Sequence, residues 1–146
     1  MIAEFFQRLR GARPETPLPE LDAQLAVGAL LVRLAKSDQH YAVEEIAKID
    51  LLLAQHYGLN PVEAAKTRAT CEKLEAQAPD TDEFTAMVQA TVDAAARLEV
   101  FEALWQVSLA DRALKPEEQA FLTGAGTALG ISDQDAADIA TRLTGA

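Results

Sequence analysis

Hydrophobic residues recur at helical spacing along most of this chain. Ile2, Phe5, Phe6 and Leu9 fall at positions i, i+3, i+4 and i+7, which predicts a short amphipathic helix in the first ten residues. The same spacing predicts further helices over residues 22–36, 43–57, 61–77, 116–129 and 132–143. The longer run over residues 82–110 is interpreted as two helices, the second near residues 98–110, and the position of the break between them is left open.

Residues that typically begin or end helices support several of these boundaries. Gly58 and Gly130 are predicted to end helices in the left-handed conformation that glycine adopts freely. Asn60 is predicted to cap the helix that begins at Pro61, and Ser132 to cap the last helix. Gly124 and Gly126, inside a predicted helix, are interpreted as sites of close helix packing.

Three prolines separate the first predicted helix from the rest of the chain. Pro14, Pro17 and Pro19 forbid a continuous helix and predict an extended linker. We therefore expect residues 1–19 to form an N-terminal helix and linker, and residues 20–146 to form the folded domain. The first helix would either contact a membrane surface or a partner groove reversibly, or fold back on the core. Because the helix is short, we expect it to fold back on the core.

An internal repeat organises the domain. Residues 35–45 and 108–118 each place an aspartate after an apolar run and a Glu-Glu pair at the start of the next helix, and residues 57–64 match residues 129–136. The repeats are placed at about residues 22–77 and 98–143. Because 146 residues make one domain of ordinary size, the repeats are expected to share one core.

Composition selects the fold class. Alanine is abundant and only 5% of the residues are aromatic, which favours closely packed helices over a sheet. We expect an all-α, single-domain bundle of about seven helices. Phe101 and Trp105, four residues apart on one predicted helix, are expected in its core.

Charge and targeting signals narrow the possible partners and location. The formal charge of −10 disfavours nucleic acid and favours cations or basic partners, although an acidic surface also serves solubility alone. A single cysteine, Cys71, excludes an internal disulfide and is expected to be a packing residue. No run is long enough to span a bilayer and no signal peptide is recognisable, so a cytoplasmic location is expected.

The two acidic loops are the candidate sites. In each, a loop aspartate and a first-turn glutamate could converge on a hard cation such as calcium. The candidate metal ligands are Asp38, His40, Glu44, Glu45, Asp111, Glu117 and Glu118. The loops carry fewer oxygen ligands than an EF-hand, and Arg112 and Lys115 would compete with a cation at the second loop. The alternative is structural, since aspartates bind loop amides and glutamates are favoured in a helix's first turn.

Catalytic patterns are lacking in the sequence. No G-x-S-x-G motif, Cys-His arrangement or phosphate-binding glycine loop is present, so an enzyme is not expected and no catalytic residue or cofactor is assigned. A small hydrolase using Asp38 and His40 is the remaining alternative, and it would require a deep pocket that joins these two residues.

These residues resemble the TerB family of tellurite resistance proteins, which are helical and carry Ala-x-x-Asp-Gly followed by a glutamate at the next helix start. The matching segments are Ala35-Lys36-Ser37-Asp38 with Glu44-Glu45, Leu109-Ala110-Asp111 with Lys115 to Leu122, and Ala128 to Ser132. The resemblance covers about residues 22–143 and implies an acidic, metal-binding surface at the Asp and Glu positions. Gln39 and Arg112 replace the family's glycine, which weighs against cation binding here.

The leading hypothesis is therefore a non-enzymatic TerB-like module for interaction or stress response in bacteria. The resemblance implies a protein partner, with a link to tellurite or other chemical stress near the membrane, and a homo-oligomer is compatible with the sequence. The alternative hypothesis, from a different class, is a sensor whose acidic loops bind a divalent cation such as calcium.

Overall fold

A computed structural model describes residues 18–145 and shows an all-α fold, as the sequence predicted. The predicted helix at residues 1–10 lies outside the described residues. In this part of the chain there are seven helices and no strands: α2 (Ala23–Ala35), α3 (Val43–Tyr57), α4 (Pro61–Gln77), α5 (Asp82–Thr91), α6 (Ala94–Ser108), α7 (Pro116–Ala128) and α8 (Asp133–Thr144). None of these helices is both long and apolar enough to cross a membrane.

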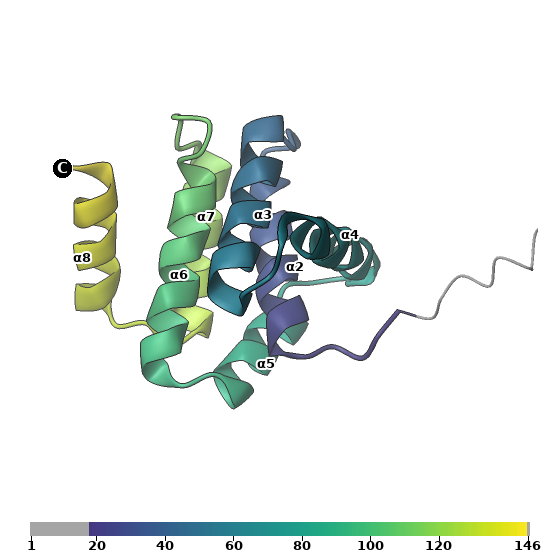
Figure 1. Ribbon diagram of the computed structural model, residues 1–146. Coiled ribbons are helices and arrows are strands. Elements are labelled where there is room, and N and C mark those ends of the chain that lie inside the picture. Colours follow the sequence, from purple (N-terminus) through teal and green to yellow (C-terminus); the bar gives the residue numbers. More distant parts are fainter. Residues whose placement is uncertain (1–17, 146) are drawn as a thin grey trace, which may run out of the picture.

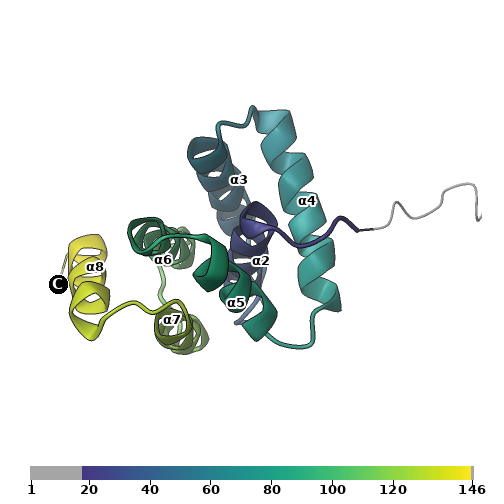
Figure 2. The same ribbon diagram turned by 90° about the horizontal axis from the view of Figure 1, so that it is seen from below.

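Helix α2 is the centre of the bundle. It packs against α3, α4, α5, α6 and α7, and Figure 2 shows it surrounded by these helices while α8 lies outermost against α6. Its sequence explains this position, because nine of its thirteen residues are buried and its single charged residue is Arg33. A helix that is apolar on nearly all sides belongs in a core.

The helix boundaries follow the predicted caps closely. Helix α3 ends at Gly58 with φ of 64°, and α4 begins after Asn60, whose side chain accepts the Glu63 N–H at 2.8 Å. The undetermined break in residues 82–110 falls at Val92 and Asp93. Asp93 caps α6 by accepting the Ala96 N–H, so α6 begins earlier than the expected start near residue 98.

Two glycines mark places where helices pack closely. A side chain at Gly28 of α2 would collide with Cys71 of α4, so the buried cysteine fills the space that this glycine leaves. A Cβ atom at Gly126 of α7 would lie 3.0 Å from the Phe101 ring of α6. The packing interpretation is therefore correct for Gly126. It is wrong for Gly124, where an added Cβ would meet nothing within 4 Å.

The two acidic loops lie at the same end of the bundle. One loop joins α2 to α3 and the other joins α6 to α7, and Figure 1 shows both at the top of the view, with α5 at the opposite end. The proposed repeats are unequal in length beyond these loops, since α4 has 17 residues and α8 has 12. The two-repeat organisation therefore remains a prediction, while the similarity of the loops can be examined residue by residue.

Candidate functional site: a carboxylate junction

The two acidic loops have the same backbone conformation. Gln39 and Arg112, which directly follow the loop aspartates, adopt left-handed φ angles of 65° and 66°. Each aspartate accepts the N–H of the residue two positions later: Asp38 Oδ1 lies 3.0 Å from the His40 nitrogen, and Asp111 Oδ1 lies 3.2 Å from the Ala113 nitrogen. Both loops therefore form a turn in which glycine is usual at the left-handed position, although Gln39 and Arg112 carry long side chains there.

The second glutamate of each Glu-Glu pair points back into its own loop. Glu45 Oε1 accepts the Ala42 N–H at 3.0 Å, and Glu118 Oε1 accepts the Lys115 N–H at 3.2 Å. Both side chains satisfy an amide that the first turn of a helix leaves without a backbone partner. Both residues are 0% exposed, although glutamates are seldom fully buried.

Lys115 connects the two loops. Its ammonium nitrogen lies 2.5 Å from Asp38 Oδ2 in the first loop and 3.1 Å from Asp111 Oδ2 in its own loop. The Asp38 side chain is only 3% exposed and that of Asp111 is 16% exposed, so both carboxylates are largely shielded from water, while the lysine side chain is 35% exposed. We call the group formed by Asp38, Glu45, Asp111, Glu118 and Lys115 the carboxylate junction.

Two oxygens of the carboxylate junction have no partner. Glu45 Oε2 and Glu118 Oε2 are buried and form no hydrogen bond with any described residue. A buried carboxylate oxygen without a partner is costly, because it has given up its water without replacement. These two oxygens are therefore the feature of the site that most needs a physical explanation.

The electrostatics of the junction divide its acids into two kinds. Burial raises the pKa of Glu118 to about 7, opposed by the Lys115 N–H and reinforced by the negative charges of Glu45, Asp111 and Asp38. Burial and the neighbouring aspartates also raise the pKa of Glu45. For Asp38 burial acts in the same direction, but the Lys115 ammonium and the His40 N–H outweigh it and lower the pKa. The ion pair with Lys115 thus favours the ionised form of Asp38, while burial opposes ionisation of the two glutamates.

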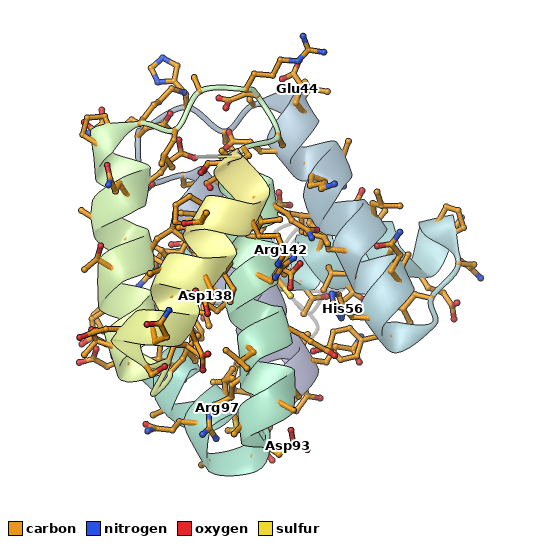
Figure 3. All side chains as sticks on the ribbon, turned by 90° about the vertical axis from the view of Figure 1, so that its left-hand side faces the viewer. Glu44, His56, Asp93, Arg97, Asp138 and Arg142 are labelled. Atoms are coloured by element: carbon orange, nitrogen blue, oxygen red, sulfur yellow. The ribbon has the colours of Figure 1, made fainter. Side chains whose placement is uncertain are left out.

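The predicted site residues separate into two groups. Asp38, Glu45, Asp111 and Glu118 meet at the junction, whereas His40, Glu44 and Glu117 are exposed. Figure 3 shows Glu44 at the end of the bundle where α3 begins. The sequence indicated that Lys115 would compete with a cation at its own loop. Its reach to Asp38, 77 residues earlier, was missed because no local spacing reports such a contact.

The arrangement was compared with what a metal ion needs. Carboxylate oxygens are the ligands that calcium and magnesium prefer, so the donor type fits a hard cation. In residues 18–145, however, no three His, Cys, Asp or Glu residues are grouped so as to hold an ion. The ammonium of Lys115 lies where the two aspartates meet. The junction as arranged is closed by Lys115 and does not fit a metal ion.

A second buried ion cluster holds the end of α4 against α2. Glu75 is 8% exposed and accepts from Arg33 at 2.9 Å and from Lys36 at 2.6 Å. The Arg33 guanidinium also donates to the backbone oxygens of Glu75 and Ala78, and lies 5.4 Å from the centre of the Phe84 ring. Burial tends to raise the pKa of Glu75, but the two cations lower it. No sequence signal indicated this cluster, whose members lie about 40 residues apart.

The hydrolase alternative required a deep pocket that joins Asp38 and His40. Neither residue lines any of the four surface pockets described for the molecule. The most apolar one, of about 210 Å³, lies between α2, α3 and α6 and has His56, Tyr57 and Glu99 among its lining residues. His40 is exposed, and its ring nitrogen Nδ1 lies 3.1 Å from the Asp38 backbone oxygen rather than from its carboxylate. The geometry gives these two residues no shared substrate site.

Comparison with known proteins gives one result. The model of the family described as "Tellurite resistance protein TerB" matches residues 24–141, which is most of the chain. No curated protein and no solved structure matches it significantly.

Proposed function

The chain belongs to the TerB family, and from that premise we propose that it is a non-enzymatic interaction module of the tellurite-resistance and stress-response type. Its contact surface is the end of the bundle that carries both acidic loops, and its partner is a protein with a basic binding segment. An acidic surface attracts such a segment and sets the rate and specificity of its docking.

This proposal rests on one observation: in each Glu-Glu pair one glutamate is buried and the other is exposed. Glu45 and Glu118 are buried and serve their own loops, while Glu44 and Glu117 are exposed and form no ion pair with a described residue. The ion pairs of Lys115 hold the two loops together, which places both exposed glutamates at one end of the molecule. The hydrogen bonds of the buried glutamates and the ion pairs of Lys115 thus hold the loops in place, and the exposed glutamates remain available to a partner.

The test is a matched pair of charge reversals. A partner is first cross-linked to the full chain in its native cell, and its binding is then measured with purified proteins. We expect Glu44→Lys with Glu117→Lys to weaken binding by about tenfold or more and to reduce its salt dependence. Glu83→Lys with Glu99→Lys makes the same charge change at exposed positions of α5 and α6 and should leave binding nearly unchanged. Equal effects of the two pairs would contradict this contact surface.

A second candidate function is a divalent-cation sensor that uses the acidic loops, which would require the Lys115 ammonium to leave the two aspartates. The two buried, unpartnered oxygens of Glu45 and Glu118 favour it, because a cation would supply the partner that they lack. The test is calorimetric titration of the full chain with calcium, magnesium, manganese and zinc, together with melting temperatures. No heat and no rise in melting temperature at millimolar metal would exclude the sensor for this protein.

A further inference from the structure

An apolar pocket lies at the end of the bundle opposite the two acidic loops. It is formed by the first turns of α2 and α6 and the last turns of α3, and nine of its twelve lining residues are aliphatic. Figure 2 views the molecule from this end. The cavity volume of about 210 Å³ is below the range of roughly 300–1,000 Å³ that is usual for small-molecule sites. The pocket therefore has the size for one or two apolar side chains.

The rim of this pocket is acidic. The charged residues that line it, or that directly adjoin a lining residue in sequence, are Asp22, Asp93, Arg97, Glu99 and Glu102. Glu102 is already paired with Arg142 at 2.8 Å. Three carboxylates and one guanidinium remain, which give the rim a formal charge of −2 with histidine neutral. A basic segment with apolar side chains would match both the charge and the lining of the pocket.

The first residues of this chain have that composition. The spacing of Ile2, Phe5, Phe6 and Leu9 predicts a helix with one apolar face, and residues 1–13 carry three arginines and one glutamate, a side-chain charge of +2. Apolar residues at i, i+3, i+4 and i+7 are the pattern with which a helix fills an apolar groove. The segment therefore complements the pocket in shape of pattern and in sign of charge.

The chain enters the fold at the same end of the molecule as the pocket. Ala23, the first residue of α2, is one of the lining residues. Figure 2 shows residues 18–22 leaving α2 on the side away from α6, so the chain must turn back around the start of α2 to reach the pocket. Residues 11–17 can span roughly 25 Å when extended, whereas a helix with its side chains is about 10–12 Å wide. The tether is therefore long enough for this turn.

We propose that residues 1–10 dock as a helix on this pocket within the same chain, with Phe5 and Phe6 in the cavity and the arginines toward the acidic rim. A short flexible tether gives an effective concentration in about the millimolar range, so even a weak contact is substantially occupied. The docked segment covers the pocket without completing the core, because the lining residues Leu31 and Leu53 are already only 1% exposed. It also leaves the acidic loops free, so this contact is independent of the proposed function.

The test places a spin label near the start of the full chain. Ala3→Cys introduces a reactive thiol, whereas the native Cys71 is fully buried and burial raises the pKa of its thiol to about 12. A thiol reagent therefore labels the new cysteine selectively. In isotope-enriched protein, the label should broaden the amide resonances of His56, Ala96 and Ala103 at the pocket and leave those of the two acidic loops sharp.

Adjacent substitutions separate docking from a general effect of charge. In the labelled chain, Phe6→Asp puts a carboxylate on the apolar face and should abolish the broadening, because an unpaired charge is costly in an apolar pocket. Gln7→Asp makes the same charge change on the polar face and should keep the broadening. On the pocket side, Glu99→Lys should weaken the broadening, most strongly at low salt. Glu83→Lys, at an exposed position of α5 that lines none of the described pockets, should not.

A mixed sample identifies the chain that supplies the segment. Spin-labelled chain without isotope is combined with isotope-enriched chain that carries no label, and broadening of the pocket resonances in this sample would show docking by a second copy and overturn the proposal. Sharp pocket resonances in the singly labelled chain, or broadening that survives Phe6→Asp, would overturn it as well. Broadening within one chain that Phe6→Asp removes and Gln7→Asp keeps is the result that supports it.

Discussion

Glu45 and Glu118 occupy equivalent positions in the first turns of α3 and α7, 73 residues apart in sequence, and each is fully buried with one carboxylate oxygen accepting a backbone N–H and the other without a partner. Burial raises the pKa of both carboxyl groups, and the negative charge of Glu45 raises the pKa of Glu118 further. The folded state therefore takes up protons at this place near neutral pH.

The first prediction concerns stability as a function of pH. The pKa of Glu118 is about 7 in the folded protein, above its ordinary value of 4.5, so between these values the folded state binds more protons than the unfolded state. The free energy of unfolding contributed by Glu118 is then fully present below about pH 4.5 and is lost as the pH rises towards 7. Urea unfolding from pH 4.5 to 7.5 should show this loss for the wild type and a flatter profile for Glu118→Gln.

The control for this prediction is Glu117→Gln, which neutralises the exposed neighbour and should keep the wild-type profile. The acids whose pKa is lowered, such as Asp38 and Glu75, act in the opposite sense and at lower pH, so they do not mask the window. Coincident profiles of the wild type and Glu118→Gln would show that Glu118 titrates in the ordinary range.

The second prediction is that Arg33 cannot be replaced by lysine. The Arg33 guanidinium pairs with the Glu75 carboxylate and also donates to two backbone oxygens at the end of α4. A lysine ammonium lacks the planar fork that reaches these acceptors together, which leaves some of them without a partner. Arg33→Lys should cost about 1–3 kcal/mol of unfolding free energy in urea.

Arg142→Lys is the comparison for Arg33→Lys. Arg142 also makes a two-pronged contact, with Glu102, but its side chain is 57% exposed, against 17% for Arg33. An exposed pair contributes little, so this change should cost much less unfolding free energy than Arg33→Lys. Equal costs at the two positions would show that shielding from water does not decide the strength of the Arg33 contacts.

The third prediction compares the effect on stability of replacing each of two glycines of α7 with alanine. Gly124→Ala should raise the unfolding free energy by about 0.5–1 kcal/mol, since alanine suits a helix better and the added methyl group meets nothing. Gly126→Ala would place a methyl group 3.0 Å from the ring of Phe101, which is 2% exposed. Overpacking costs about 1–3 kcal/mol, so Gly126→Ala should be destabilising. Calorimetric melting of the two variants gives the sign directly, and a gain at both positions would contradict the close contact.

Local sequence signals were sufficient for most of the fold. Gly58, and Asn60 with Pro61, fix the end of α3 and the start of α4 because their preferences are properties of one or two residues. The start of α6 was placed late because the alanines that follow Asp93 carry no hydrophobic period, although Asp93 itself was a cap signal. Gly126 and Gly124 look alike in sequence, and only the position of Phe101 distinguishes them.

The candidate site was predicted in its parts but not in its assembly. The spacing from aspartate to glutamate identified Asp38, Glu45, Asp111 and Glu118, because these residues act within one loop. Sequence could not tell which member of each Glu-Glu pair is buried, since adjacent helical positions differ by about 100° around the axis. It also could not place the Lys115 ammonium on Asp38, because this contact depends on how two distant loops meet in the fold.

The fourth prediction concerns residues 1–13. The described helices already enclose a continuous core in which Leu30, Leu34 and Leu104 are fully buried. We expect a chain without residues 1–13 to keep its helical circular dichroism and its cooperative melting, because that core does not depend on the removed part. Ile49→Ala in the full chain provides the contrast, since deleting this buried side chain should cost about 2–5 kcal/mol. Loss of cooperative melting on truncation would show instead that the first residues belong to the core.

The last prediction concerns the two left-handed loop residues. Gln39 and Arg112 hold φ angles of 65° and 66°, where a residue with a side chain pays roughly 1–2 kcal/mol that glycine avoids. Glycine relieves this strain, but it also loses more conformational entropy on folding, which offsets part of the relief. Gln39→Gly and Arg112→Gly should therefore each stabilise the protein by about 0.5–1 kcal/mol. Ala113→Gly, next to Arg112 and outside the left-handed region, carries the same unfolded-state cost without relief of strain, so it should be destabilising. Urea unfolding of the three variants tests this contrast. A loss at both left-handed positions would mean that the Gln39 and Arg112 side chains stabilise the loops by more than their backbone strain costs.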